Sequence, residues 1–136
     1  MHSVRTMIQV AAIFGVLLAP LAANALTVDR VTVTGHAATR ERAILEAEQT
    51  AVAKIVARYV APAESEKKRL ILVDQVLPYS KSYLHAFEIV EERVDDEGYV
   101  EITALAGVEV GRLVTTLRNL DIEVRFIHLG PVTQCC

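Results

Sequence analysis

Cysteine is almost missing from this 136-residue chain, whose only two cysteines, Cys135 and Cys136, are its last residues. Neighbouring α-carbons lie ~3.8 Å apart, whereas an unstrained disulfide spans about 4.4–6.8 Å. We therefore expect no bridge between them. In an oxidising compartment the thiols either link two chains or stay free, or the tail has no packing role. In each case the fold does not depend on disulfides.

The chain also lacks an excess of positive charge. It has 14 Lys and Arg against 17 Asp and Glu, which gives a formal net charge of −3. Its densest basic stretch, "EKKR" at 66–69, is typical of a solvated helix start. Because nucleic-acid binding needs a basic patch that neutralises phosphates, we expect no nucleic-acid partner.

Neither a glycine-rich loop nor a nucleophile in a catalytic setting is present. The six glycines are dispersed, which excludes a phosphate-binding loop. Ser80 and Ser82 flank Lys81 in "PYSKSY", but no strand-turn-helix elbow surrounds either serine. Aromatic residues make up only 5% of the chain, and their strand and helix spacing favours a core or an interface. We predict that the chain is not an enzyme.

Potential metal ligands are few and scattered. The acidic turn "DDEG", Asp95 to Gly98, lacks the alternating ligand spacing of a calcium loop. His36, His85 and His128 fall on predicted strands. Even if His85 and His128 lay together, two imidazoles would not complete a tetrahedral zinc site. We expect a solvated turn, strand histidines, and no bound metal or cofactor.

An apolar run, Ile8 to Ala22, follows Arg5 and precedes the small residues Ala23-Asn24-Ala25. This pattern predicts a secretory signal peptide over residues 1–25, cut after Ala25. A transmembrane anchor is the competing interpretation, but the run has about 15 residues where a bilayer span needs roughly 20. No cysteine follows the small residues, so no lipid attachment point is predicted. We expect an exported, soluble chain that meets the membrane only through its cleaved signal peptide.

The first half of the remaining chain predicts a strand and then helices. "LTVDRVTVTGHA", Leu26 to Ala37, alternates valine with threonine, as a strand does. Thr39 to Val60 carries apolar residues at helical spacing, which predicts a helix that Thr39 caps and that ends before Pro62. The stripe is rich in alanine, so this helix can lie close to a sheet. Leu70 to Leu77 is too short for periodicity to decide, and we favour a helix.

The second half predicts a hairpin. Tyr83 to Val94 is strand-like, and Val100 to Val110 matches a period of two. Asp95 to Gly98 forms the turn between them, where Gly98 supplies the positive φ. One side of the second strand is apolar, and the opposite side carries Glu101, Thr103, Leu105, Gly107 and Glu109.

The last elements are a helix over Gly111 to Leu120 and a further strand, predicted from the alternation of Ile122, Val124 and Phe126. Together the elements predict one α+β domain over residues 26–130, with a tail at 131–136. Its sheet is mostly antiparallel with about four strands, and one long and two short helices pack on one face.

The succession of these stretches resembles a known family. A strand ending in "VTGHA", the helix "AILEAEQTAVAKIV", a short helix, "SYLHAFEIVEE" and "GYVEITALAGVEVGRLVTTL" resemble the N-terminal domain of flagellar assembly protein T and related small secreted envelope domains. The resemblance covers Val31 to Leu120. Tyr83-Leu84 and Phe87 match the family's aromatic-aliphatic pair and its later aromatic, while Ser82 stands where a glycine is common.

The resemblance implies a periplasmic part of the ring around a flagellar basal body, which acts by contact rather than turnover. Its partners would be envelope proteins, those of the basal body or a second copy of the chain. We expect the interaction surface to include Tyr83, Glu101, Leu105 and Glu109, with Leu105 as its apolar centre. The alternative is a periplasmic small-ligand-binding module, or an envelope lipoprotein-like domain unrelated to flagella. Whether the chain is a stand-alone domain or part of a longer protein stays open.

Overall fold

The computed structural model describes residues 27–125, so the predicted signal peptide and the tail lie outside the described residues. The elements in order are β1 (Val28–Ala37), α1 (Arg40–Tyr59), α2 (Pro62–Lys67), α3 (Arg69–Gln75), the 3₁₀ helix η2 (Leu77–Tyr83), β2 (Leu84–Val94), β3 (Val100–Glu109) and α4 (Val110–Asn119).

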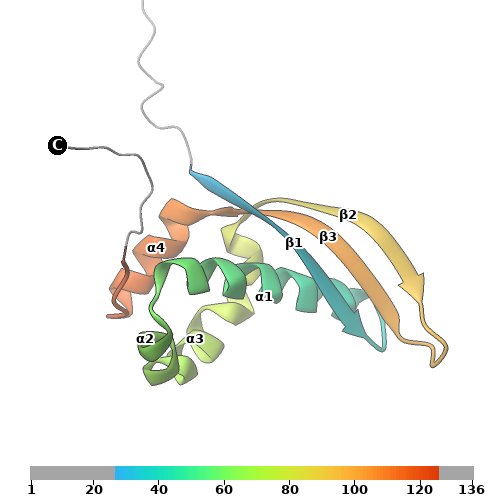
Figure 1. The fold of residues 1–136 in the computed structure, drawn as a ribbon, viewed down its shortest axis with the longest axis horizontal. Coiled ribbons are helices and arrows are strands. Elements are labelled where there is room, and N and C mark those ends of the chain that lie inside the picture. Colours follow the sequence, from blue (N-terminus) through green and yellow to red (C-terminus); the bar gives the residue numbers. More distant parts are fainter. Residues whose placement is uncertain (1–26, 126–136) are drawn as a thin grey trace, which may run out of the picture.

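The α+β prediction is confirmed. The strands form one antiparallel sheet in the order β1-β3-β2, and the helices gather on one side of it (Figure 1). The long helix α1 begins with the predicted cap, because the Thr39 side chain accepts a hydrogen bond from the backbone N–H of Arg42. Alternation along β3 buries Ile102, Ala104 and Ala106 beneath the sheet, as predicted.

The number of strands is three, not four. Residues 122–125 of the predicted last strand pair with no strand among the described residues, and Phe126 lies outside them. Their polar contacts go to helices instead. The backbone N–H of Glu123 donates to the Glu64 carboxylate at 3.0 Å, and that of Arg125 donates to the Tyr59 carbonyl at 2.8 Å, at the end of α1. The alternation of apolar residues in this segment reflects the burial of Ile122, which is only 2% exposed.

The segment between α1 and β2 holds more helix than predicted. α3 confirms the helix expected over 70–77, but α2 and η2 are additions. Pro62 ends α1, as predicted, and also occupies the first turn of α2, where its missing N–H removes no hydrogen bond. The polar sequence of α2 carries no helical apolar stripe, and none of its residues is buried.

The helix α1 packs closely against β1 in the core. Ala43, Ala47 and Ala51 are fully buried on the sheet side of α1. A β-carbon added at Gly35 would overlap the Ala43 carbonyl oxygen and lie 2.8 Å from the Ala47 nitrogen. The alanine stripe therefore brings the helix backbone against the strand, and Gly35 is the residue that permits this distance.

Candidate interaction surfaces

The side of the sheet away from the helices, here called the open face, is polar with an apolar centre. Leu105 of β3 is 38% exposed and lies opposite Thr32 of β1 and Glu88 of β2 in the two registers. Side chains of directly opposite residues share one face of a sheet. Two residues earlier on β3, Thr103 lies opposite Thr34 of β1 and Glu91 of β2. The open face is therefore an extended surface that centres on one leucine.

Two of the predicted surface residues, Glu101 and Glu109, lie on the open face as paired carboxylates. Glu101 lies opposite Arg93 of β2 and accepts a hydrogen bond from its Nε at 2.6 Å. Glu109 accepts one from Nε of Arg112 at 2.8 Å, at the start of α4. Both arginines are largely exposed, so these pairs contribute little to stability. In each pair the arginine offsets the charge of the glutamate at that end of the open face.

Tyr83 does not belong to this surface. It ends η2 instead of beginning a strand, and only 5% of it is exposed. The sequence signal was ambiguous because an aromatic residue before a strand suits both a strand start and a core position. The predicted surface therefore reduces to Glu101, Leu105 and Glu109, which share the sheet face away from the helices.

A second cluster forms where the hairpin tip meets the end of β1. Asp95 Oδ1 accepts hydrogen bonds from the backbone N–H groups of Glu97 and Tyr99, each at 2.9 Å. Asp95 Oδ2 lies 2.9 Å from Nε2 of His36. The His36 ring stacks on Tyr99, with ring centroids 5.2 Å apart. Gly98 adopts a φ of 87°, as the turn requires. The acidic turn thus ties β1 to the hairpin.

The electrostatics of this cluster follow from that contact. The hydrogen bond to Asp95 raises the pKa of His36 above its usual range. The hydrogen bond from His36, with those from the backbone, lowers the pKa of Asp95. Sequence reasoning found the turn but missed its partner, because His36 is far from Asp95 in the chain. The remaining histidines lie elsewhere: His85 is exposed at a bulge of β2, and His128 lies outside the described residues.

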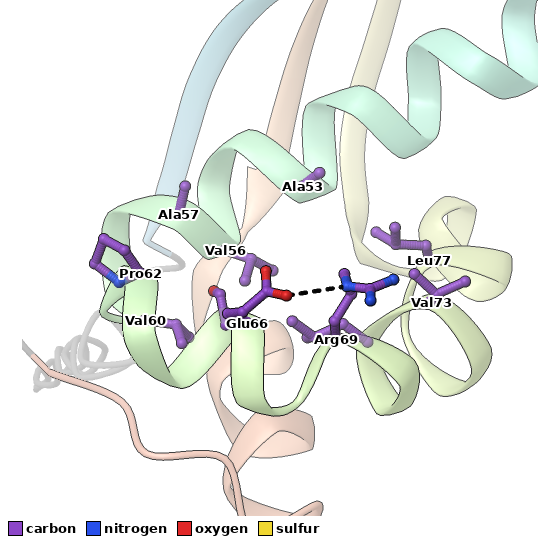
Figure 2. A pocket seen from close by; sticks show the side chains of 11 residues that line it. Ala53, Val56, Ala57, Val60, Pro62, Glu66, Arg69, Val73 and Leu77 are labelled. Atoms are coloured by element: carbon purple, nitrogen blue, oxygen red, sulfur yellow. Dashed lines mark ion pairs between the residues drawn. The ribbon is translucent and has the colours of Figure 1, made fainter.

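An apolar groove of about 430 Å³ separates α1 from α2 and α3 (Figure 2). Ala53, Ala57 and Val73 are among the residues that line it. At its rim Glu66 and Arg69 form an exposed ion pair at 3.6 Å. These two residues of the "EKKR" stretch lie beside the groove, where α2 ends and α3 begins. The sequence did not reveal the groove, because it exists only where the α2–α3 pair folds back under α1.

The serines considered for catalysis hold the backbone. The hydroxyl of Ser80 donates to the Leu77 carbonyl, and that of Ser82 donates to the Tyr79 carbonyl, each at 2.7 Å. In the range 27–125, no three His, Cys, Asp or Glu side chains come together in a way that could hold a metal ion. No helix within the same range has the length and apolarity of a membrane span.

The chain matches no protein-family model, and neither a curated protein nor a solved structure is significantly similar to it.

Proposed function

We propose that this chain is a periplasmic structural or assembly protein that works through protein contacts, in ring assembly at a flagellar basal body. The observation that carries the proposal is the open face, where Leu105 is exposed at the centre of a surface of hydroxyls and charged side chains. Interfaces of this kind have an apolar core with a polar rim. The resemblance to flagellar assembly protein T adds the location and the class of partner.

The open face suits a protein partner better than a small ligand, because a small ligand needs a concave site. The apolar groove lies under α1, on the helix side of the sheet. The two surfaces belong to opposite sides of the domain, so their roles can be tested separately.

The test is co-purification with detergent-washed basal bodies, using the full chain with a C-terminal tag. We expect the wild-type chain to stay in that fraction and Leu105→Arg to be lost from it at least about tenfold, since a central interface residue contributes roughly 2 kcal/mol. Leu105→Arg should fold normally, because Glu88 lies opposite and can pair with the new guanidinium. Leu70→Arg is the matched control: Leu70 is 75% exposed on α3, away from the open face, so its retention should equal that of the wild type.

A wild-type chain that is free in the periplasm of a flagellated cell would refute the flagellar role. The groove would then be the place to test the small-ligand alternative. If Leu105→Arg instead loses helicity or solubility, Leu105 is a core residue and the open face is not the contact surface.

A further inference from the structure

β1 is an edge strand. The sheet order places β3 on one side of it, and no other strand among the described residues pairs with its second side. An edge strand presents unpaired N–H and C=O groups that can template a further strand. β1 is also regular, because all ten of its residues pair with β3 without a register shift.

The outward-facing groups of β1 can be assigned. The Thr27 carbonyl points towards the β3 side, because it accepts the backbone N–H of Val110. Successive residues of a strand direct their backbone groups to opposite sides, so the groups of Val28, Arg30, Thr32, Thr34 and His36 point outward. An independent contact agrees, since the outward N–H of His36 donates to the Glu46 carboxylate on α1. Glu46 thus closes one end of the edge, and within residues 27–125 the outward backbone groups of 28–34 pair with no other strand.

The other edge, β2, is protected in the usual ways. Its pairing with β3 shifts register at His85 and again at Val90, and bulges twist an edge away from partners. It also carries consecutive charges at Glu91, Glu92 and Arg93. By contrast, the β1 stretch from Val31 to Gly35 has no charged residue. The two edges therefore differ, and β1 is the one that is available for pairing.

We propose that β1 pairs antiparallel with β1 of a second copy, about a two-fold axis at Val31. This register centres the open stretch 28–34 on itself. It places Thr32 opposite Arg30 of the second copy and Thr34 opposite Val28, so that outward-facing groups meet outward-facing groups. Asp29 lies opposite Val33 of the second copy, and no like charges face each other. A two-fold contact of this kind is self-complementary and closes at two copies.

The neighbouring side of α1 leaves room for this pairing. From Glu46 that side continues at helical spacing through Thr50, and then through Ala53 and Ala57, which also line the apolar groove. All three side chains are small, so on α1 itself they leave space beside the edge. Because the pairing aligns residues of the same face, the two open faces lie on one side of the joined sheet. The dimer then presents two Leu105 residues to a partner, which goes beyond the proposed function and does not depend on it.

The first experiment measures the mass of the protein in solution by sedimentation equilibrium. It uses the full chain with Cys135→Ser and Cys136→Ser, so that terminal thiols cannot link two copies. We expect a dimer, and we expect Thr32→Pro to weaken it at least about tenfold. Proline is tolerated at an edge position whose N–H faces solvent, and it removes a donor that the pairing needs. A monomeric parent chain, or a Thr32→Pro variant that folds and dimerises like the parent, overturns the proposal.

If Thr32→Pro fails to fold, two matched lysine variants test whether the β1 edge is the dimer interface. Thr32→Lys places a charge opposite Arg30 of the second copy and should weaken the dimer. Thr103→Lys places the same charge on the same face of the central strand and should leave dimerisation unchanged. Equal effects of the two variants would mean that the β1 edge is not the interface. Leu105→Arg should dimerise normally, so a failed flagellar role and a failed dimer are distinguishable.

The register is tested by oxidation of Val31→Cys in the same background. In the proposed register the two Val31 residues form a non-hydrogen-bonded pair. The α-carbons of such a pair lie about 4.5 Å apart in an antiparallel sheet, which is within the range of a disulfide. Val31→Cys should therefore form covalent dimers. Thr34→Cys should not, since its opposite residue is Val28 rather than a second cysteine. Cross-linking of Thr34→Cys without Val31→Cys would refute the two-fold axis at Val31.

Discussion

Replacing Gly35 by alanine probes the closest approach in the fold. The added β-carbon would overlap the Ala43 carbonyl oxygen and lie 2.8 Å from the Ala47 nitrogen, both in the backbone of α1. No flexible side chain can move aside, so the helix itself must withdraw from the sheet. Overpacking of a core typically costs about 1–3 kcal/mol. Because the obstructing atoms belong to the backbone, we expect Gly35→Ala to lower the free energy of unfolding by about 3 kcal/mol. That is a large part of the roughly 5–15 kcal/mol that stabilises a domain.

The assay is urea unfolding followed by far-ultraviolet circular dichroism, because the chain has no tryptophan. With a denaturant slope of about 1–3 kcal/mol per molar urea, the midpoint should fall by roughly 1–3 M. Gly111→Ala is the matched control: an added β-carbon meets nothing within 4 Å there, inside α4. Because Gly111 lies in the first turn of α4, this variant should be as stable as the wild type or gain up to about 0.5 kcal/mol. A Gly35→Ala variant within about 1 kcal/mol of the wild type would show that α1 is not held against β1 in this way.

Two pH-dependent predictions accompany it. The His36–Asp95 contact should stabilise the fold at about pH 5.5, where both groups are charged. This stabilisation is lost as pH rises through the raised pKa of His36, and also as pH falls through the lowered pKa of Asp95. His36→Ala should therefore lower the unfolding midpoint at about pH 5.5 and have less effect at about pH 8.5; an equal effect at both would show that stacking on Tyr99 dominates. Burial raises the pKa of Glu48, and the charge of Lys81 offsets this only in part, so stability falls as pH rises through that raised pKa. Glu48→Gln should raise the thermal midpoint at about pH 7 and not at about pH 4, and a lower midpoint at neutral pH would contradict this reasoning.

The sequence predicted the elements whose local pattern is strong. The period of two in β1 and β3 and the helical stripe of α1 placed these elements and their buried faces. Gly98 marked the turn, because a positive φ has a recognisable residue preference. The segment after α4 was predicted wrongly as a strand. Its alternation is real, but alternation reports only which side chains are buried, and the backbone of Glu123 and Arg125 bonds to helices.

The candidate surfaces divide in the same way. The sequence by itself determined that Glu101, Leu105 and Glu109 share one side of a strand, because the side-chain period of a strand is fixed at two residues. Only the tertiary structure decided that Tyr83 is buried, that His36 meets Asp95, and that a groove lies under α1. Each depends on segments far apart in the chain, and no local pattern encodes which distant residue will be the neighbour. The same holds for the β1 edge, since strand order is a property of the assembled sheet.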